Sequence, residues 1–336
     1  MQSLFILGNG FDLHHKLPTR YKNYRCFLQA KYPWLVSDYE TFAHLDCDGD
    51  DRWMNIERAL CIDYVAMLEK LTRDDALNVD TYRLDLADAL LEVDESMRFI
   101  FDFTGEAFAE WVATIGAVPA DPDLSLPAKS AFVTFNYTNT LERLYDVDSG
   151  DILHLHGAID MVDPAELVPA DYEVVYPAQI PEDIDFPEVV ARKDEPNNTY
   201  IRGIIKFGNP TVAPGDVRTE LETVFEQIAL QPSSLRCVDR IAGYAKATFK
   251  DLSANYGILR EFLGKRPFDT VVVFGHSFDG VDMPYYSDVF APMLRDCRWV
   301  FWERVPEQRK AAIDRFCTKL DIRRYAVTGI GEGLYA

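Results

Sequence analysis

The sequence has few of the features that mark secreted, metal-stapled or membrane-spanning proteins. Its six cysteines are scattered over 336 residues with no CxxC pair, a spacing that suits neither a disulfide framework nor a zinc ribbon. No stretch approaches the roughly 18 consecutive apolar residues that a transmembrane helix needs. The opening MQSLFILGNGFD lacks a cationic region before its apolar run, so it predicts a first strand and not a signal peptide. We therefore expect a cytoplasmic protein with reduced thiols.

Positive charge is also scarce. Lys and Arg number 34 against 55 Asp and Glu, which gives a formal net charge of -21. A chain this acidic lacks the basic face that attracts phosphate backbones, so a nucleic-acid-targeting toxin and binding to anionic membranes are both disfavoured. Hydrophobic residues make up 48% of the chain, which predicts a folded protein of one large or two ordinary domains.

Short apolar runs that alternate with helical patterns predict an α/β fold. Several runs are apolar on both faces, as in the central strands of a parallel sheet, which favours a Rossmann-like parallel sheet flanked by helices. The expected strands are 3–7, 131–135, 151–155, 203–207, 270–274, 298–302 and 322–327. Apolar residues spaced three and four apart predict helices at 55–73, 81–115, 218–230, 241–262 and 307–320.

Two interruptions of the strand pattern predict how the chain is divided. Residues 1–30, 129–157 and 200–336 are expected to form the Rossmann-like core. Residues 31–128 would be a mostly helical insertion or cap, and residues 158–199 an acidic, proline-rich excursion. An irregular segment as long as the excursion is unusual in a compact domain unless it is functional or has short structure of its own.

Small and polar residues follow four of the predicted strands. Ligands of doubly wound sheets bind beyond the carboxyl ends of the strands, so these turns predict a pocket at one edge. A G-x-G turn after the first strand lets backbone approach a pyrophosphate, although the full GxGxxG is missing and a tight strand-to-loop turn is the alternative. The turns are Gly8-Asn9-Gly10-Phe11-Asp12, Asn136-Tyr137-Thr138, His156-Gly157 and Gly275-His276-Ser277.

Two residues in these turns are candidates for chemistry. Thr138 or Asn139 is expected to cap the helix that follows, which leaves Asn136 for a ligand. Strand alternation puts His154 and His156 on the same side, with His154 as a core histidine and His156 in the more exposed place beside a glycine. An imidazole there can act as base or hydrogen-bond donor, so Asn136 and His156 are the candidate catalytic residues.

The run FGHSFDG resembles the nucleophile elbow of serine hydrolases only in part. Ser277 would be the nucleophile, but the fifth position is Asp279, and no histidine follows His276 to complete the triad in the required chain order. We expect Ser277 either to donate its hydroxyl to a phosphate or ribose or to form a turn. No metal site is expected, because no HxxxH, HExxH or Cys/His cluster occurs.

Four sequence motifs together resemble one known family. GNGFDLHHKLPTRY, FNYTNTLE, LHLHG and FGHSFDGVDMPYY resemble the AbiH family of phage abortive-infection proteins, which is similar to the sirtuin-like group of NAD-binding folds. The resemblance implies that NAD binds at the carboxyl edge as substrate or ligand, with Asn136 positioning ribose or water and His156 as the base. The cofactor-binding residues expected on this basis are Gly8, Asn9, Gly10, Phe11, Asp12, Gly275, Ser277 and Asp282.

The activity expected from this resemblance is hydrolysis of the nicotinamide–ribose bond to nicotinamide and ADP-ribose. Bond cleavage passes through an oxocarbenium-like state, and an oriented water in a shielded pocket suffices without metal. The sequence differs from this family pattern in two respects. Thr138 replaces an Asp found in many NAD-cleaving relatives, and the four-cysteine zinc module of sirtuin deacylases is missing. A non-catalytic sensor of NAD or ADP-ribose is the alternative. Because a toxic activity must be restrained, we also expect a homo-oligomer or a regulatory protein partner.

Overall fold

The chain divides into two compact units. The computed structural model describes residues 2–42, 68–69, 93–94, 106–158, 218–219, 221–223, 235–248, 252–278 and 282–332. Unit 1 consists of Met1–Arg20, Val112–Val162 and Asp251–Ala336, and unit 2 of Tyr21–Trp111 and Asp163–Lys250. Most of the predicted insertion (31–128) and nearly all of the predicted excursion (158–199) lie outside the described residues, so the predicted division of the chain stays a prediction.

Unit 1 is built on a parallel sheet, which has six strands in the part of the chain described. Every neighbouring pair is parallel and the order is β3-β2-β1-β4-β5-β6, so the chain starts in the middle and winds outward in both directions. The prediction of an α/β, Rossmann-like parallel sheet is therefore confirmed. The strands are β1 Ser3–Leu7, β2 Ser130–Thr134, β3 Ile152–His154, β4 Thr270–Phe274, β5 Arg298–Glu303 and β6 Tyr325–Gly329.

Predicted and observed strands agree best at the centre of the sheet. The bounds of β1 and β4 are those predicted, whereas β6 begins at Tyr325 and not at residue 322. The segment before β6 turns at Asp321, whose φ of 54° lies in the left-handed region, and apolar periodicity gives no sign of such a turn. The predicted strand at 203–207 lies outside the described residues.

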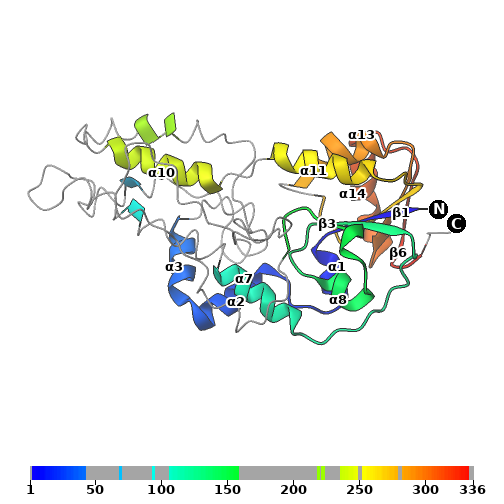
Figure 1. Cartoon of the computed structure of the whole chain (residues 1–336), viewed down its shortest axis with the longest axis horizontal. Coiled ribbons are helices and arrows are strands. Elements are labelled where there is room, and N and C mark those ends of the chain that lie inside the picture. Colours follow the sequence, from blue (N-terminus) through cyan, green and yellow to red (C-terminus); the bar gives the residue numbers. More distant parts are fainter. Residues whose placement is uncertain are drawn as a thin grey trace, which may run out of the picture. The chain divides into compact units, whose positions relative to one another are not determined.

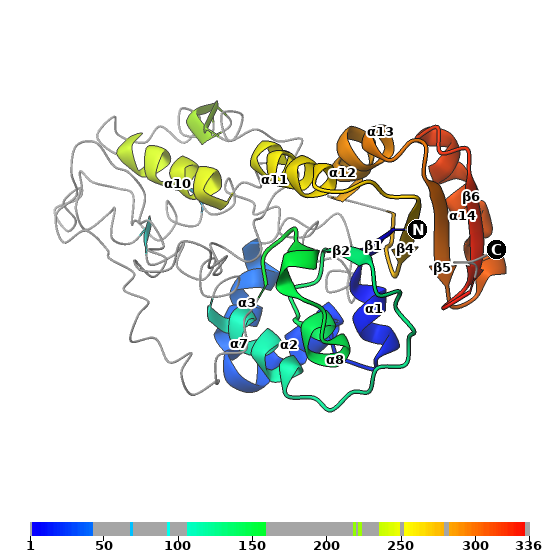
Figure 2. The ribbon, with the colours of Figure 1, turned by 45° about the vertical axis from the view of Figure 1, so that its right-hand side comes forward.

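Helices cover both faces of this sheet, as Figures 1 and 2 show. Leu4 and Ile6 of β1 join a core cluster on one face, and Phe5 and Leu7 join a second cluster on the other. Because both faces are covered, the central strands are continuous apolar runs. The first cluster includes side chains of α11 Leu252–Gly264, α12 Met283–Tyr285, η6 Tyr286–Phe290, α13 Ala291–Met293 and α14 Pro306–Lys319. The second includes side chains of α1 Asn9–His14 and α8 Thr140–Tyr145.

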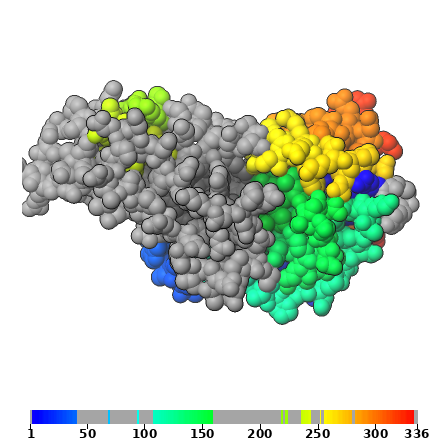
Figure 3. Space-filling view, in the orientation of Figure 1, coloured from blue at the N-terminus to red at the C-terminus, as the bar shows by residue number. Residues whose placement is uncertain are grey.

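In the space-filling view, the residues of α11 to α13 lie directly against the green residues that follow β2 and β3 (Figure 3). Both groups belong to unit 1. The contact is also present in the core, where Phe135 and Leu155 share a cluster with Leu259 of α11 and Tyr285 of α12. The helices after β3 and β4 therefore enclose the residues at the ends of these strands.

Unit 2 is helical in its described residues. It contains α2 Tyr21–Lys31, α3 Pro33–Phe42, α10 Leu235–Thr248 and the first part of α7 Glu106–Gly116. Two helices, α10 and α11, stand where the periodicity predicts one helix over 241–262, and they belong to different units. The 218–230 and 55–73 helices lie largely outside the described residues, whereas α14 matches the prediction of 307–320 closely. None of the helices that the structure describes has the length and apolarity needed to cross a bilayer.

Candidate functional site

The turns that carry the predicted site residues meet at one edge of the sheet. Leu7, the last residue of β1, lies beside Thr134 of β2 on one side and Phe274 of β4 on the other, and Thr134 lies beside His154 of β3. Four neighbouring strands therefore end at the same level. The strand order reverses between β1 and β4, and this switch point is where doubly wound sheets bind ligands.

The glycine turn after β1 packs directly against the turn after β4. The N–H groups of Gly8 and Gly10 donate to the carbonyls of Phe274 and Gly275, each at 2.9 Å. A Cβ on Gly8 would lie 2.6 Å from the carbonyl oxygen of Gly275, and Gly275 itself has a φ of 73°, which favours glycine. The N–H of Phe11 donates to Gly8 O at 2.9 Å. A phosphate bound at this edge would therefore need donors other than these three N–H groups.

The remainder of the first motif is held together by its own hydrogen bonds. The Asn9 amide donates to the carbonyl of Thr19 at 2.9 Å and accepts the Thr19 hydroxyl at 2.5 Å. His15 Nδ1 lies 2.7 Å from the carbonyl of Phe11, which can only accept, so Nδ1 carries the proton. Asn9 and Phe11 thus shape the turn, and the Asn and Thr of GNGFDLHHKLPT close the loop that contains them.

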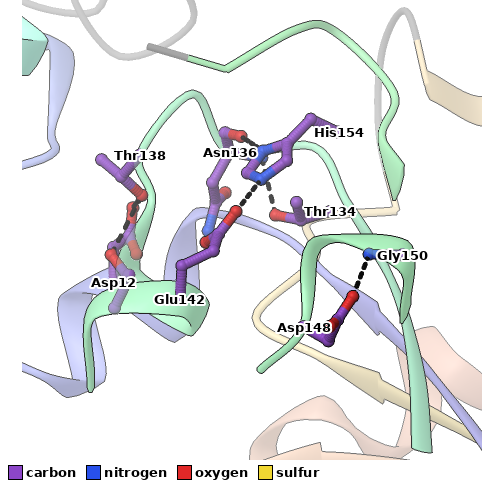
Figure 4. Close-up of polar contacts among 9 residues, drawn as sticks. Asp12, Thr134, Asn136, Thr138, Glu142, Asp148, Gly150 and His154 are labelled. Carbon is purple, nitrogen blue, oxygen red and sulfur yellow. Dashed lines mark hydrogen bonds and ion pairs between the residues drawn. The ribbon is translucent and has the colours of Figure 1, made fainter. Parts of the chain in front are cut away.

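Asp12 joins the first turn to the turn after β2 (Figure 4). The hydroxyl of Thr138 donates to Asp12 Oδ2 at 2.6 Å, and the hydroxyl of Thr140 donates to that of Thr138 at 3.1 Å. Burial raises the pKa of the Asp12 carboxyl group, against the opposing effect of hydrogen bonds from Thr138 and Thr140. A carboxyl group therefore lies beside Thr138, although position 138 itself carries none.

Neither of the predicted helix caps forms. Asn139 occupies the N-cap position of α8, but its side chain makes no capping hydrogen bond. The hydroxyl of Thr138 donates instead to the buried carboxyl of Asp12. A cap by Thr138 is predicted from the local sequence alone, whereas its actual partner, Asp12, lies in a distant part of the chain.

Asn136 is fixed through both its side chain and its backbone (Figure 4). Its Nδ2 donates to Gly8 O at 3.1 Å, its N–H donates to Thr134 Oγ1 at 3.0 Å, and its carbonyl lies 3.2 Å from His154 Nδ1. The other ring nitrogen of His154 lies 2.9 Å from Glu142 Oε1. Because a carbonyl and a carboxylate both accept, the two hydrogen bonds form together only when the ring carries two protons. His154, expected in the core, thus links α8 to the Asn136 turn.

His156 lies on the opposite face of the sheet from His154, which contradicts the predicted alternation. Its ring packs edge-on against Phe135 at 5.2 Å between centroids and lies 6.0 Å from the ring of Tyr285. The strand ends at His154, and Gly157, with a φ of 89°, donates back to the carbonyl of His154. Alternation no longer applies in such a turn. The His156 side chain is 3% exposed, so it is also more buried than predicted.

The carboxylate of Asp282 lies between two histidines. Its Oδ1 is 3.4 Å from His156 Nε2, and its Oδ2 is 3.5 Å from His276 Nε2. Phe135 packs edge-on against both imidazoles, at 5.2 Å and 4.9 Å between centroids. The ring of Tyr286 packs against His276 at 5.0 Å, and burial together with the charge of Asp282 raises the pKa of its phenol well above the usual 10.0. We call His156, Asp282 and His276 the His–Asp–His cluster.

Ser277 is a predicted site residue that is not a member of these clusters. It is exposed, and its carbonyl and that of His276 each accept from Arg309 Nη2 at 3.3 Å.

Sequence reasoning missed His276, which appeared only as the neighbour of Ser277. The GHS turn was a usable signal, but nothing local could show that Asp282 would connect it to His156. Across the described ranges, no three His, Cys, Asp or Glu side chains are grouped so that they could hold a metal ion.

A doubly wound parallel sheet with polar clusters at its carboxyl edge defines a Rossmann-like protein with a candidate ligand site. Residues 4–303 match the family described as "Bacteriophage abortive infection AbiH". The match covers most of the chain, which therefore belongs to the AbiH family. No curated protein and no solved structure matches it.

Proposed function

We propose that this AbiH protein acts against phage by binding NAD at the carboxyl edge of its sheet and hydrolysing the nicotinamide–ribose bond. The observation that carries the proposal is the arrangement after β2 and β3. There, the fixed amide of Asn136 stands in one turn, and the imidazole of His156 stands in the next, 3.4 Å from the carboxylate of Asp282. The family description supplies the anti-phage role.

In this mechanism His156 is the general base. It takes a proton from water, and Asp282 stabilises the imidazolium that results, because an opposite charge at this distance favours the protonated ring. The water oxygen bonds to C1′ of the ribose as the C1′–N bond breaks. The bonding pair leaves with nicotinamide, which becomes neutral, and ADP-ribose is the second product. Because positive charge develops on the ribose, a carboxylate near the reacting bond suits the reaction.

Asn136 orients the reacting groups. Its Nδ2 is committed to Gly8 O, so its Oδ1 is the atom that accepts from a ribose hydroxyl or from the attacking water. Thr134 and His154 hold its backbone in place. Asp12 and Thr138 keep the same turn against α1. The glycine turns then act by bringing β1 and β4 together and not by wrapping a phosphate with their N–H groups.

The test is to incubate pure full-length protein with NAD and to separate the products by chromatography. We expect nicotinamide and ADP-ribose in equal amounts, and we expect Asn136→Ala and His156→Ala each to lower kcat by about 100-fold or more. Asn139→Ala is the matched control, because it removes an amide from the same turn whose side chain makes no capping hydrogen bond. That variant keeps the wild-type kcat.

Other outcomes decide between the remaining candidates. If neither the pure protein nor phage-infected cells release nicotinamide, the chain is not an NAD hydrolase. Calorimetric binding of NAD or ADP-ribose without turnover would instead identify a non-catalytic sensor that signals to a partner. Full activity in Asn136→Ala would remove Asn136 from the site. Light scattering on the same sample tests the expected homo-oligomer.

A further inference from the structure

We infer that His276 is a positioning residue, which orients the Asp282 carboxylate toward His156 through the close contact between its Nε2 and Asp282 Oδ2. His156 is then the histidine of the cluster that takes up a proton. The kinetic consequence rests on the proposed function. The effect on the titration of His156 does not depend on any turnover, so the two can be tested separately.

The backbone decides which nitrogen of His276 carries its proton. The N–H of Phe278 lies 3.3 Å from His276 Nδ1. Because a backbone N–H can only donate, Nδ1 is the acceptor and the proton of the neutral ring is on Nε2. That nitrogen lies 3.5 Å from Asp282 Oδ2. His276 therefore presents an N–H to the carboxylate and leaves Oδ1 to face His156.

A strained residue holds the N–H of Phe278 in this place. Phe278 has a φ of 60°, a left-handed conformation that is unfavourable for a residue with a side chain. Its ring packs against Phe316 at 4.5 Å between centroids, and the Arg309 guanidinium lies 5.6 Å from the ring centroid. Arg309 also donates to the carbonyl of His276. Relaxing the turn would break these contacts, so packing offsets the strain and keeps the N–H aimed at Nδ1.

The ring nitrogens of the two histidines have different surroundings. On His276, Nδ1 already accepts from the N–H of Phe278. On His156 a positive ring is attracted by Asp282. Among the described residues, the rings of Phe135, Tyr137 and Tyr285 also pack against His156. The carboxylate beside its Nε2 is what makes His156 the proton acceptor in this inference.

The experiment follows the His156 ring by NMR in full-length protein with labelled histidine. His276→Leu removes the donor, whereas His276→Gln keeps an N–H near the position of Nε2. Because the carboxylate is no longer held toward His156, we expect its titration midpoint to fall by about half a unit or more in the Leu variant. The Gln variant returns it toward the wild-type value. The acid limb of kcat/KM for NAD moves to lower pH by the same amount, since the base is active when unprotonated.

The matched control is His14→Gln. His14 also pairs with an aspartate, Asp123, at 3.0 Å, but it belongs to α1 on the other face of the sheet. This variant removes a His–Asp pair of the same kind without touching the cluster. We expect it to leave the midpoint of His156 unchanged.

An unchanged midpoint in folded His276→Leu overturns the inference, whatever the activity. If the Leu variant does not fold, the wild-type nitrogen shifts of His276 decide: the neutral ring must carry its proton on Nε2. A neutral ring with its proton on Nδ1 equally overturns the inference. Shifted midpoints in a protein that never cleaves NAD would reject the proposed function and support this inference alone.

Discussion

Three glycines at the switch point determine how closely the turns after β1 and β4 approach each other. A Cβ on Gly10 would overlap Cα of Gly275, and a Cβ on Gly275 would lie 2.5 Å from Cα of Gly10. The obstacle in each case is backbone, which cannot rotate away as a flexible side chain can. These glycines therefore act by steric exclusion, a role that the motif G-x-G does not distinguish from phosphate binding.

Substitution of Gly10 by Ala tests this role. We expect Gly10→Ala to lower the free energy of unfolding by about 2 kcal/mol or more, because the added methyl group forces the two turns apart. Gly257→Ala is the control: it lies exposed in α11, and a Cβ there meets no atom within 4 Å. The control should gain about 0.5 to 1 kcal/mol from helix propensity. Urea unfolding measures both, and a Gly10→Ala variant as stable as the wild type would contradict the steric argument.

The sequence could predict the residue types at the strand ends but not their partners. Asn136, His156 and Asp282 were identifiable because they follow apolar runs or lie in recognisable motifs. The face on which His156 lies could not be predicted, since it depends on a strand that ends at His154. The pairing of His276 with Asp282 is a contact across a turn whose geometry depends on the packing of Phe278, which no local pattern encodes.

At the scale of elements, the contact between Asp12 and Thr138 connects α1 to the turn before α8. Burial raises the pKa of this carboxyl, so ionising it costs more in the folded protein than in the unfolded chain. The folded state therefore loses stability, relative to the unfolded chain, as the pH rises from the ordinary pKa of 3.8 through the raised one. Asp314 on α14 is the opposite case, because hydrogen bonds from Tyr325 and Lys310 lower its pKa.

Asp12→Asn should remove this pH dependence. We expect the stability of wild type relative to the variant to fall as the pH rises from about 4 to 7, by about 1.4 kcal/mol per unit of raised pKa. For Asp314→Asn the wild type should gain relative stability as the pH rises from the lowered pKa through the ordinary value of 3.8, because a lowered pKa favours the ionised folded state. Urea unfolding at several pH values measures both slopes. Parallel curves for wild type and Asp12→Asn would show that the folded state does not perturb this carboxyl.

The bounds of a helix or strand could be predicted from the sequence where all its apolar residues pack into the core of one unit. The runs that form β1 and β4 are apolar throughout because both faces of the sheet are covered, and their bounds were predicted without error. The prediction of one helix over 241–262 is wrong because the apolar residues of this stretch pack in two different units, those of α10 in one and those of α11 in the other. Periodicity reports that a helix face is apolar, but not which core it joins.

At the scale of the whole molecule, the net charge of -21 has a consequence for stability. Like charges on a folded surface repel one another, and salt screens this repulsion more than it weakens buried contacts. We expect the Tm to rise by a few degrees between about 10 and 300 mM NaCl. Calorimetry measures this directly. A Tm that falls with salt would mean that ion pairs such as Arg266–Asp151, at 2.6 Å, outweigh the repulsion.

The order of strands in the sheet also bears on when the His–Asp–His cluster can form during synthesis of the chain. β1, the first element made, lies at the centre of the sheet and has β4 as one of its two neighbours. At about 5 to 20 residues per second, a ribosome needs on the order of tens of seconds to reach β4 after making β1. Until then the nascent chain has neither His276 nor Asp282. An incompletely translated chain therefore cannot assemble the His–Asp–His cluster.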